Sequence, residues 1–145
     1  MPHAFQKQRV CLTTNTWTSI QNLSYMCLTT HWIDNDWNLN KRILNFCIVP
    51  NHKGVTISKH IEKCLQEWGI DRIFTITLDN ASSNDTAIKY LKRKTKDWKT
   101  TILDWKTTIL DNEFLHMRCC AHIVNLIVCE GLKDKMNQLL RLEMQ

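Results

Sequence analysis

The stretch RIFTITLDNASSND, at residues 72–85, limits the possible folds of this 145-residue chain more than any other part of it. Its first half is β-branched and apolar on both faces, which indicates a strand covered on both sides. Asp79 follows that strand directly, and Ser82 with Asp85 fits a capping box that starts a helix. A strand that places a carboxylate beside a helix start is typical of an α/β domain.

Alternating patterns predict three strands before this point. Residues 8–14 form a short apolar strand that we expect to end at Asn15, because the polar segment after it resembles a turn. Residues 24–33 and 39–49 alternate with period two and predict a β-hairpin. The residues between them, Asp34, Asn35 and Asp36, have typical turn chemistry.

Helical periodicity appears next. Residues 56–68 place apolar side chains on one stripe and charged ones on the other, and Gly69 stands where a helix C-terminus favours glycine. The helix that starts at Ser82 is expected to run to about Lys94. The predicted order is strand, strand, strand, helix, strand, helix, so we expect a mixed sheet with a hairpin on one edge.

The last third of the chain is the most apolar. Residues 114–118 predict a short strand, and residues 121–128 predict a helix hydrophobic almost all round, which implies burial. Helical periodicity continues after Gly131. Before this region DWKTTIL occurs twice in succession at residues 97–110, which we interpret as a local duplication in a surface loop or in lengthened element ends.

Composition sets broad limits. A chain of 145 residues with 43% hydrophobic content can form one core, so residues 1–145 are expected to be a single domain. The net charge of +5 permits nucleic-acid binding without arguing for it. The absence of a signal-peptide pattern and of a long apolar run predicts a soluble, intracellular protein without a membrane partner. The seven cysteines contain no CxxC pair and are expected to be reduced.

Four strings carry a resemblance to a known family: LTTNTWTSIQNLSYMCLTTHWID, RILNFCIVPNHKG, IEKCLQEWGIDRIFTITLDNASSND and LHMRCCAHIVNLIV. In order and spacing they resemble the ribonuclease H-like core of hAT-superfamily transposases, particularly the zinc-finger-BED, ricesleeper-like group. The similarity covers about residues 8–135. It implies an α/β fold with a mixed five-stranded sheet (hairpin plus parallel strands) and flanking helices, incomplete at the C-terminus, and a nuclear location.

The resemblance also implies roles for single residues. In the family, two aspartates at the ends of adjacent central strands and a distant glutamate bind Mg or Mn for cutting and joining DNA. Asp79 matches the second acidic position, whereas the first is occupied by Asn15. Cys119 and His122 match a CxxH signature. The glutamate lies beyond a helical insertion and matches no residue here, and neither the BED zinc finger nor the dimerisation region has a counterpart.

This pattern predicts a loss of catalysis. Two-metal phosphoryl transfer needs anionic oxygen ligands that hold two cations about 4 Å apart. An asparagine supplies a neutral oxygen of similar shape, and even the loss of an outer-shell partner costs roughly 10- to 100-fold in affinity or activity. We therefore expect no bound metal and no strand transfer or nicking.

Simpler interpretations stand beside these. Asp79 could be a helix-terminal anion, and Asn15 a turn residue. Cys119 and His122 could form half a zinc site, but packing is the favoured role because no second ligand pair is evident. One basic cluster could follow a DNA backbone, although a solvated helix C-terminus is the favoured interpretation. The cluster consists of Lys89, Lys92, Arg93, Lys94 and Lys96.

Three functions remain open. The favoured one is a transposase-derived domain fragment that is catalytically inactive and associates with DNA or another nucleic acid. The second is an interaction module that docks on a full-length transposase-like protein through the apolar C-terminal helix. The third is a residual metal-dependent nuclease that uses Asp79 with substituted ligands.

Overall fold

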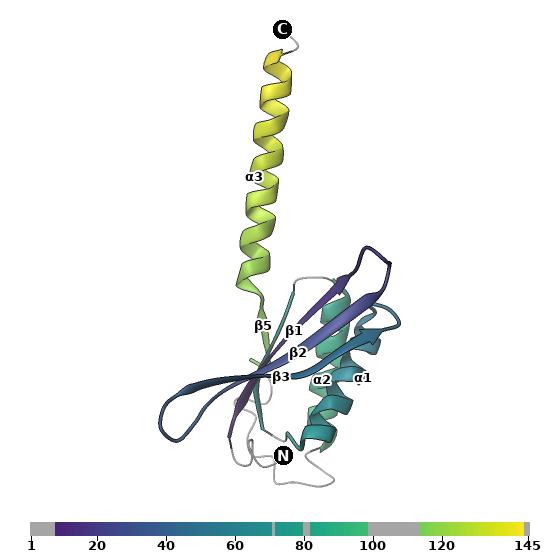
Figure 1. Cartoon of the computed structure of the whole chain (residues 1–145), viewed down its shortest axis with the longest axis vertical. Coiled ribbons are helices and arrows are strands. Elements are labelled where there is room, and N and C mark those ends of the chain that lie inside the picture. The colour runs from purple at the N-terminus through teal and green to yellow at the C-terminus, as the bar shows by residue number, and fades with distance from the viewer. Residues whose placement is uncertain (1–7, 71, 80–81, 99–113, 144–145) are drawn as a thin grey trace.

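The computed structural model describes residues 8–70, 72–79, 82–98 and 114–143. Within these ranges the chain forms a sheet, two helices packed together and one long projecting helix (Figure 1). In chain order the elements are β1 (Val10–Thr18), β2 (Ser24–Ile33), β3 (Leu39–Val49), α1 (Gly54–Trp68), β4 (Ile73–Leu78), α2 (Ser82–Trp98), β5 (His116–Arg118) and α3 (Cys120–Glu143).

The sheet is mixed, as the sequence predicts. Its five strands lie in the order β3-β2-β1-β4-β5. The first three are antiparallel neighbours, whereas β4 runs parallel to β1 and β5 runs parallel to β4. The predicted α/β architecture, with a hairpin on one side and parallel strands on the other, is confirmed.

The end of the first strand is the main correction within the sheet. We expected it at Asn15, but β1 continues to Thr18 and the turn begins at Ser19. The residues after Asn15 pair with β2, with Trp17 opposite Tyr25 and Thr18 opposite Ser24. β-Branched and aromatic cross-strand pairs favour strand over turn, so the polar appearance of this segment is misleading.

Asp34 organises the predicted turn between β2 and β3. Its carboxylate accepts hydrogen bonds from the backbone N–H groups of Asp36 (3.0 Å) and Asn38 (2.9 Å). The same carboxylate accepts a bond from the side-chain amide of Asn40 at 2.9 Å. Trp37 adopts a positive φ of 64° at this turn and is 86% exposed.

One face of the sheet carries the core. α1 and α2 pack against each other and lie on the same side of the sheet (Figure 1). The stripe predicted for α1 is buried, and Gly69 ends that helix in the left-handed conformation at φ 60°. Apolar side chains from both helices and four strands form one cluster, which includes Leu12, Met26, Leu28, Ile57, Ile61, Leu65, Ile76, Leu78, Ile88 and Leu91.

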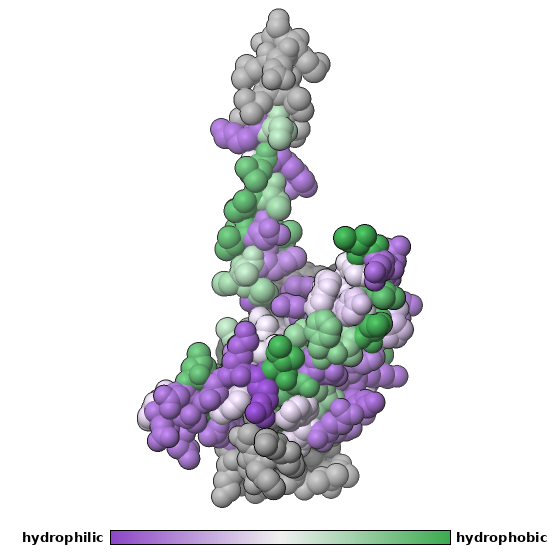
Figure 2. Space-filling view, viewed as in Figure 1, coloured by the Kyte–Doolittle hydropathy of each residue, from purple (hydrophilic) through white to green (hydrophobic). Residues whose placement is uncertain are grey.

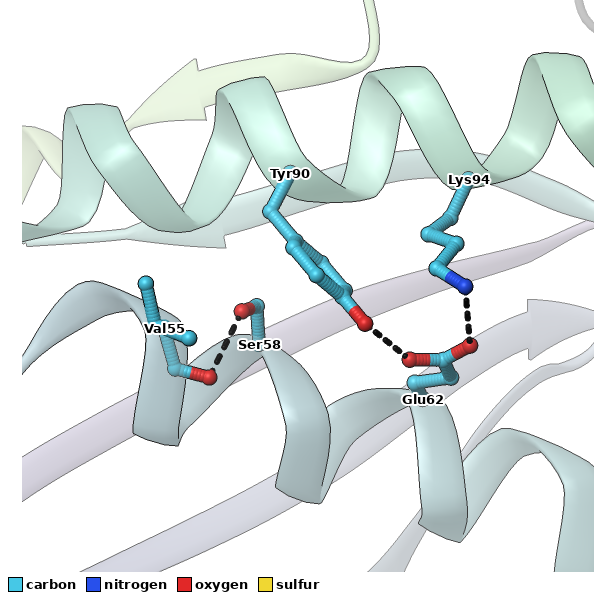
Figure 3. A network of polar contacts seen from close by, with 5 residues as sticks. All are labelled: Val55, Ser58, Glu62, Tyr90 and Lys94. Carbon is cyan, nitrogen blue, oxygen red and sulfur yellow. Dashed lines mark hydrogen bonds and ion pairs between the residues drawn. The ribbon is translucent and has the colours of Figure 1, made fainter.

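A polar contact also joins the two helices. The Tyr90 hydroxyl of α2 donates to a carboxylate oxygen of Glu62 on α1 at 2.8 Å, and Lys94 lies 3.8 Å from the other oxygen (Figure 3). α2 extends to Trp98, four residues beyond the predicted end at Lys94. The duplicated segment 97–110 therefore begins within this helix, and residues 99–110 lie outside the described residues.

α3 contradicts the predicted burial of residues 121–128. It is a single helix of 24 residues that extends away from the sheet (Figure 1). Apolar side chains lie along the part of α3 whose side chains are described (Figure 2), and Ile127 is 67% exposed. High apolar content shows that this segment favours burial, but it does not show what covers the segment.

Candidate functional site

The two positions that the resemblance matches, Asn15 and Asp79, follow the paired residues of β1 and β4. β1 and β4 are parallel neighbours, and Thr13 lies opposite Thr77. The same register, continued by two residues, brings Asn15 level with Asp79. Asp79 follows the last residue of β4, whereas Asn15 lies within β1 and is exposed. The extended register therefore predicts that Asn15 and Asp79 are neighbours, as the resemblance implies.

The first turn of α2 holds the Asp79 side chain. The Asn84 amide nitrogen lies 2.5 Å from one Asp79 carboxylate oxygen and 3.3 Å from the Asp79 backbone oxygen. Asn84 itself is buried, with 3% exposure. No sequence pattern predicts a role for Asn84, although it belongs to the same DNASSND string as Asp79.

The donor set at this level is poor for a hard divalent cation. It offers the Asp79 carboxylate, which the Asn84 amide already contacts, and the neutral amide of Asn15. Divalent cations such as magnesium and manganese favour several anionic oxygens. Among the described residues, no three His, Cys, Asp or Glu side chains are grouped closely enough to hold a metal ion. These residues therefore do not fit the two-metal site that the family resemblance implies.

Cys119 and His122 lie where β5 passes into α3. The Cys119 N–H donates to the Leu78 oxygen at 3.1 Å, and its carbonyl accepts from the Ile123 N–H at 3.2 Å. Both Cys119 and His122 are partly exposed. The backbone of Cys119 thus joins the end of β4 to the start of α3. Any residue type could make these backbone bonds, so the packing role expected for the side chains of Cys119 and His122 stays a prediction.

His116 on β5 is the residue of this region with a shifted pKa. Burial is the main cause and lowers the pKa of His116 below 6.5, and Arg118 and Lys92 act in the same direction. Asp85 in the first turn of α2 opposes them. The sequence analysis did not single out this histidine, because its burial depends on how β5 pairs with β4.

The predicted basic cluster does not form one uniform surface. Lys89 and Arg93 are exposed on α2, one helical turn apart. Arg93 and Lys94 both lie against the Tyr90 ring, and Lys94 also pairs with Glu62. Lys92 is partly exposed, and the side chain of Lys96 lies outside the described part of the chain. Lys89 and Arg93 are therefore the cations of this cluster most exposed to a polyanion.

The mixed sheet and its strand order define the chain as a ribonuclease H-like domain. Residues 13–107 match the family model described as the ZBED1 RNase-like domain. The chain therefore belongs to this family, the RNase-like domain of hAT-type transposases. No solved structure gives a significant match.

Three curated relatives show the range of the similarity. The putative AC transposase of Zea mays is 38% identical over 87% of this chain and 15% of its own length. The zinc finger BED domain-containing protein RICESLEEPER 2 of Oryza sativa subsp. japonica is 34% identical over 82% of this chain and 16% of its own length. The putative transcriptional regulator tpeD of Talaromyces stipitatus is 30% identical over 88% of this chain and 14% of its own length. The chain thus spans about one seventh of each relative.

Among the helices that the structure describes, none is both long and apolar enough to cross a bilayer.

Proposed function

We propose that this chain is a transposase-derived ribonuclease H-like domain that cannot cut or join DNA by itself and that associates with DNA through its surface cations. The observation that supports this proposal is the parallel pairing of β1 with β4, whose register at Thr13 and Thr77, continued by two residues, leads to Asn15 and Asp79. In the metal site that the resemblance implies, a carboxylate occupies the position of Asn15. An uncharged amide there leaves Asp79 as the single anionic group of the pair.

The missing charge has a larger effect than a change of geometry. Two cations about 4 Å apart repel each other and need a cage of carboxylates to stay bound. Asn15 preserves the shape of a carboxylate but not its charge, so it cannot balance the second cation. The outcome is a domain that keeps the fold without the electrostatics needed for phosphoryl transfer.

DNA association is proposed as a separate property. Lys89 and Arg93 are exposed on α2, and contacts between such cations and phosphates need no catalytic metal. The transposase and regulator names belong to the relatives, whose length this chain covers only in small part. Nuclear action of this chain is proposed as a consequence of the DNA association.

A nicking assay tests the catalytic part. Supercoiled plasmid is incubated with the purified chain and Mg²⁺ or Mn²⁺, in parallel with Asp79→Ala, and the open-circular product is quantified. We expect both proteins to give the background rate, because the metal cage is incomplete in both. Metal-dependent nicking that is present in the native chain and lost in Asp79→Ala would overturn the proposal and support a residual nuclease.

A further inference from the structure

Asn84 is a polar residue at the start of the buried face of α2. Four residues of this helix are buried at the spacing of one helix face: Asn84, Ala87, Ile88 and Leu91. The last three are apolar, whereas Asn84 carries an amide and is only 3% exposed. Burying an amide costs free energy unless the amide is hydrogen-bonded. The partners of Asn84 therefore bear on how α2 packs against the sheet.

The hydrogen bonds of Asn84 fix the orientation of its amide. The amide nitrogen lies 2.5 Å from a carboxylate oxygen of Asp79 and 3.3 Å from the backbone oxygen of Asp79. Both of these atoms are acceptors, so the flipped amide would place its oxygen against two other oxygens. The Asn84 oxygen is buried, and no described residue is hydrogen-bonded to it. The hydrogen bonds of this buried amide thus end on Asp79.

A buried amide specifies the position of a helix more strictly than apolar packing does. Apolar contacts are non-directional, so an apolar core can adjust to a small rotation of a helix. The Asn84 amide would lose its hydrogen bonds in such a rotation, and an unpaired buried amide costs its full desolvation penalty. A single buried asparagine sets the register of coiled coils for the same reason.

This contact needs an acceptor oxygen at residue 79 but not a negative charge. An asparagine there would offer a carbonyl oxygen of nearly the same shape. Metal binding, which the resemblance implies, requires the charge of Asp79, and so does stabilisation of a helix N-terminus by an anion. A substitution that removes only the charge therefore separates these roles.

We propose that Asp79 is a positioning residue in this chain, and that its contact with Asn84 is a clamp that fixes the rotation of α2 without a metal. The clamp joins the end of β4 to the first turn of α2. Its effect extends to Lys89 and Arg93, which are exposed one turn apart on the same helix. The consequence for these two cations rests on the proposed DNA association, whereas the clamp itself does not.

Urea unfolding of single and double variants tests the clamp. We expect Asp79→Ala and Asn84→Ala each to raise the unfolding equilibrium constant at least about 10-fold, because each leaves a buried polar group unpaired or removes it. The double variant should lie within about 3-fold of the less stable single variant. Asp79→Asn should stay within about 3-fold of the native chain. Asp85→Asn is the matched control, because it removes an exposed carboxylate from the same helical turn.

The comparison of Asp79→Asn with Asp79→Ala decides between the roles. Native-like stability of Asp79→Asn, equal in EDTA and in Mn²⁺, supports the clamp, even if Asp79→Ala does not fold. An Asp79→Asn chain as unstable as Asp79→Ala would overturn it, because the charge would then be what matters. Stabilisation of the native chain by Mn²⁺ that Asp79→Asn abolishes would overturn it as well. So would additive effects of Asp79→Ala and Asn84→Ala.

DNA binding gives a readout that local stability alone would not change. Fluorescence anisotropy with duplex DNA at increasing salt compares folded Asn84→Ala and Asp79→Asn with the native chain. We expect Asn84→Ala to reduce the slope of the logarithm of the binding constant against the logarithm of salt by at least about one, because Lys89 and Arg93 lose their fixed placement. Asp79→Asn should keep the native slope.

Two results would count against different parts of the account. A native slope in Asn84→Ala would overturn the link between the clamp and the two cations. A native chain that does not bind DNA would contradict the proposed association, and the unfolding constants would still decide whether the clamp exists.

Discussion

At the scale of single residues, the candidate site is defined by a pair of side chains on neighbouring strands. Asp79 is held by Asn84, and Asn15 lies level with it in the extended register. A carboxylate and an amide have nearly the same shape, so packing tolerates both, but only the carboxylate balances a cation. In the proposed account, a difference in charge is what separates this site from a working metal site.

His116 gives a prediction about pH. Its pKa is lowered from 6.5, chiefly by burial, so the unfolded chain binds more protons than the folded protein as the pH falls through that value. The contribution of His116 to stability is complete above about pH 7 and is lost as the pH falls toward 5. His31, whose pKa is lowered by burial and by Lys41, acts in the same direction.

Urea unfolding at pH 7.5 and pH 5 measures this effect. We expect the native chain to lose stability at pH 5, His116→Gln to lose less, and His116→Gln combined with His31→Gln to lose least. Asp34 does not interfere, because its pKa is lowered from 3.8 and it titrates below this range. An identical loss of stability in all three proteins would contradict the prediction.

These residues differ in how far the sequence reveals them. The roles expected for Asp79 and Asn15 rest on motifs of the resemblance and stay predictions, and the strand end expected at Asn15 is wrong because β1 runs to Thr18. His116 could not be predicted, since the burial that chiefly lowers its pKa depends on how β5 pairs with β4, which no local pattern encodes. Asn84 stood in a conspicuous string, but its bond to Asp79 depends on where α2 begins.

At the scale of elements, α1 and α2 are joined by the contact among Glu62, Tyr90 and Lys94 as well as by apolar packing. Tyr90→Phe removes a hydroxyl that donates to a carboxylate. We expect the free energy of unfolding to fall by about 1 kcal/mol, because the contact is partly exposed and water competes for it. The corresponding drop in melting temperature is roughly 3 °C for a chain of this size.

Tyr25→Phe is the matched control for this prediction. This variant also removes a tyrosine hydroxyl, but it keeps a ring that can stack on Trp17. We expect the free energy of unfolding to change by no more than about 0.5 kcal/mol. Chemical denaturation of both variants measures the difference. Equal losses in the two variants would show that the Tyr90 bond contributes nothing specific.

The strands and helices also show which sequence signals succeed. β2, β3 and α1 were predicted within two residues, because alternation and a terminal glycine are local signals. β1 was predicted too short, since its last residues are stabilised by pairing with β2. In β3 we read no irregularity, yet a bulge near Leu44 buries that side chain while Phe46 and Ile48 stay exposed. Such a bulge follows from pairing with Leu28 and Thr29, which one strand alone does not reveal.

At the scale of the whole molecule, the net charge of +5 and the exposed cations of α2 bear on DNA association. If Lys89 and Arg93 contact phosphates, the logarithm of the binding constant for duplex DNA should fall linearly with the logarithm of the salt concentration. The double substitution Lys89→Gln with Arg93→Gln should reduce that slope by about two. Fluorescence anisotropy between 50 mM and 200 mM salt measures it.

Lys63→Gln provides the control, because Lys63 is 75% exposed on α1 and pairs with Glu67. We expect this variant to keep the native slope. A native chain that does not bind DNA at 50 mM salt would contradict the proposed association. An unchanged slope in the double variant would contradict a contact between α2 and the phosphates.

The position of α3 is the part of the architecture that sequence patterns could not supply. Its composition predicted burial, and the structure leaves it exposed beside a sheet whose second face is also uncovered. Hydrophobicity measures how strongly a segment favours burial, whereas its partner depends on chain topology and on other molecules.

Manganese affinity tests the central claim, the loss of the metal cage at Asn15, most directly. Mn²⁺ is titrated into the native chain, Asn15→Asp and Asn15→Asp with Asp79→Ala, and the free ion is followed by electron paramagnetic resonance. We expect weak binding by the native chain, affinity at least about 10-fold higher in Asn15→Asp, and loss of the gain in the double variant. Tight binding by the native chain that Asn15→Asp leaves unchanged would contradict the account.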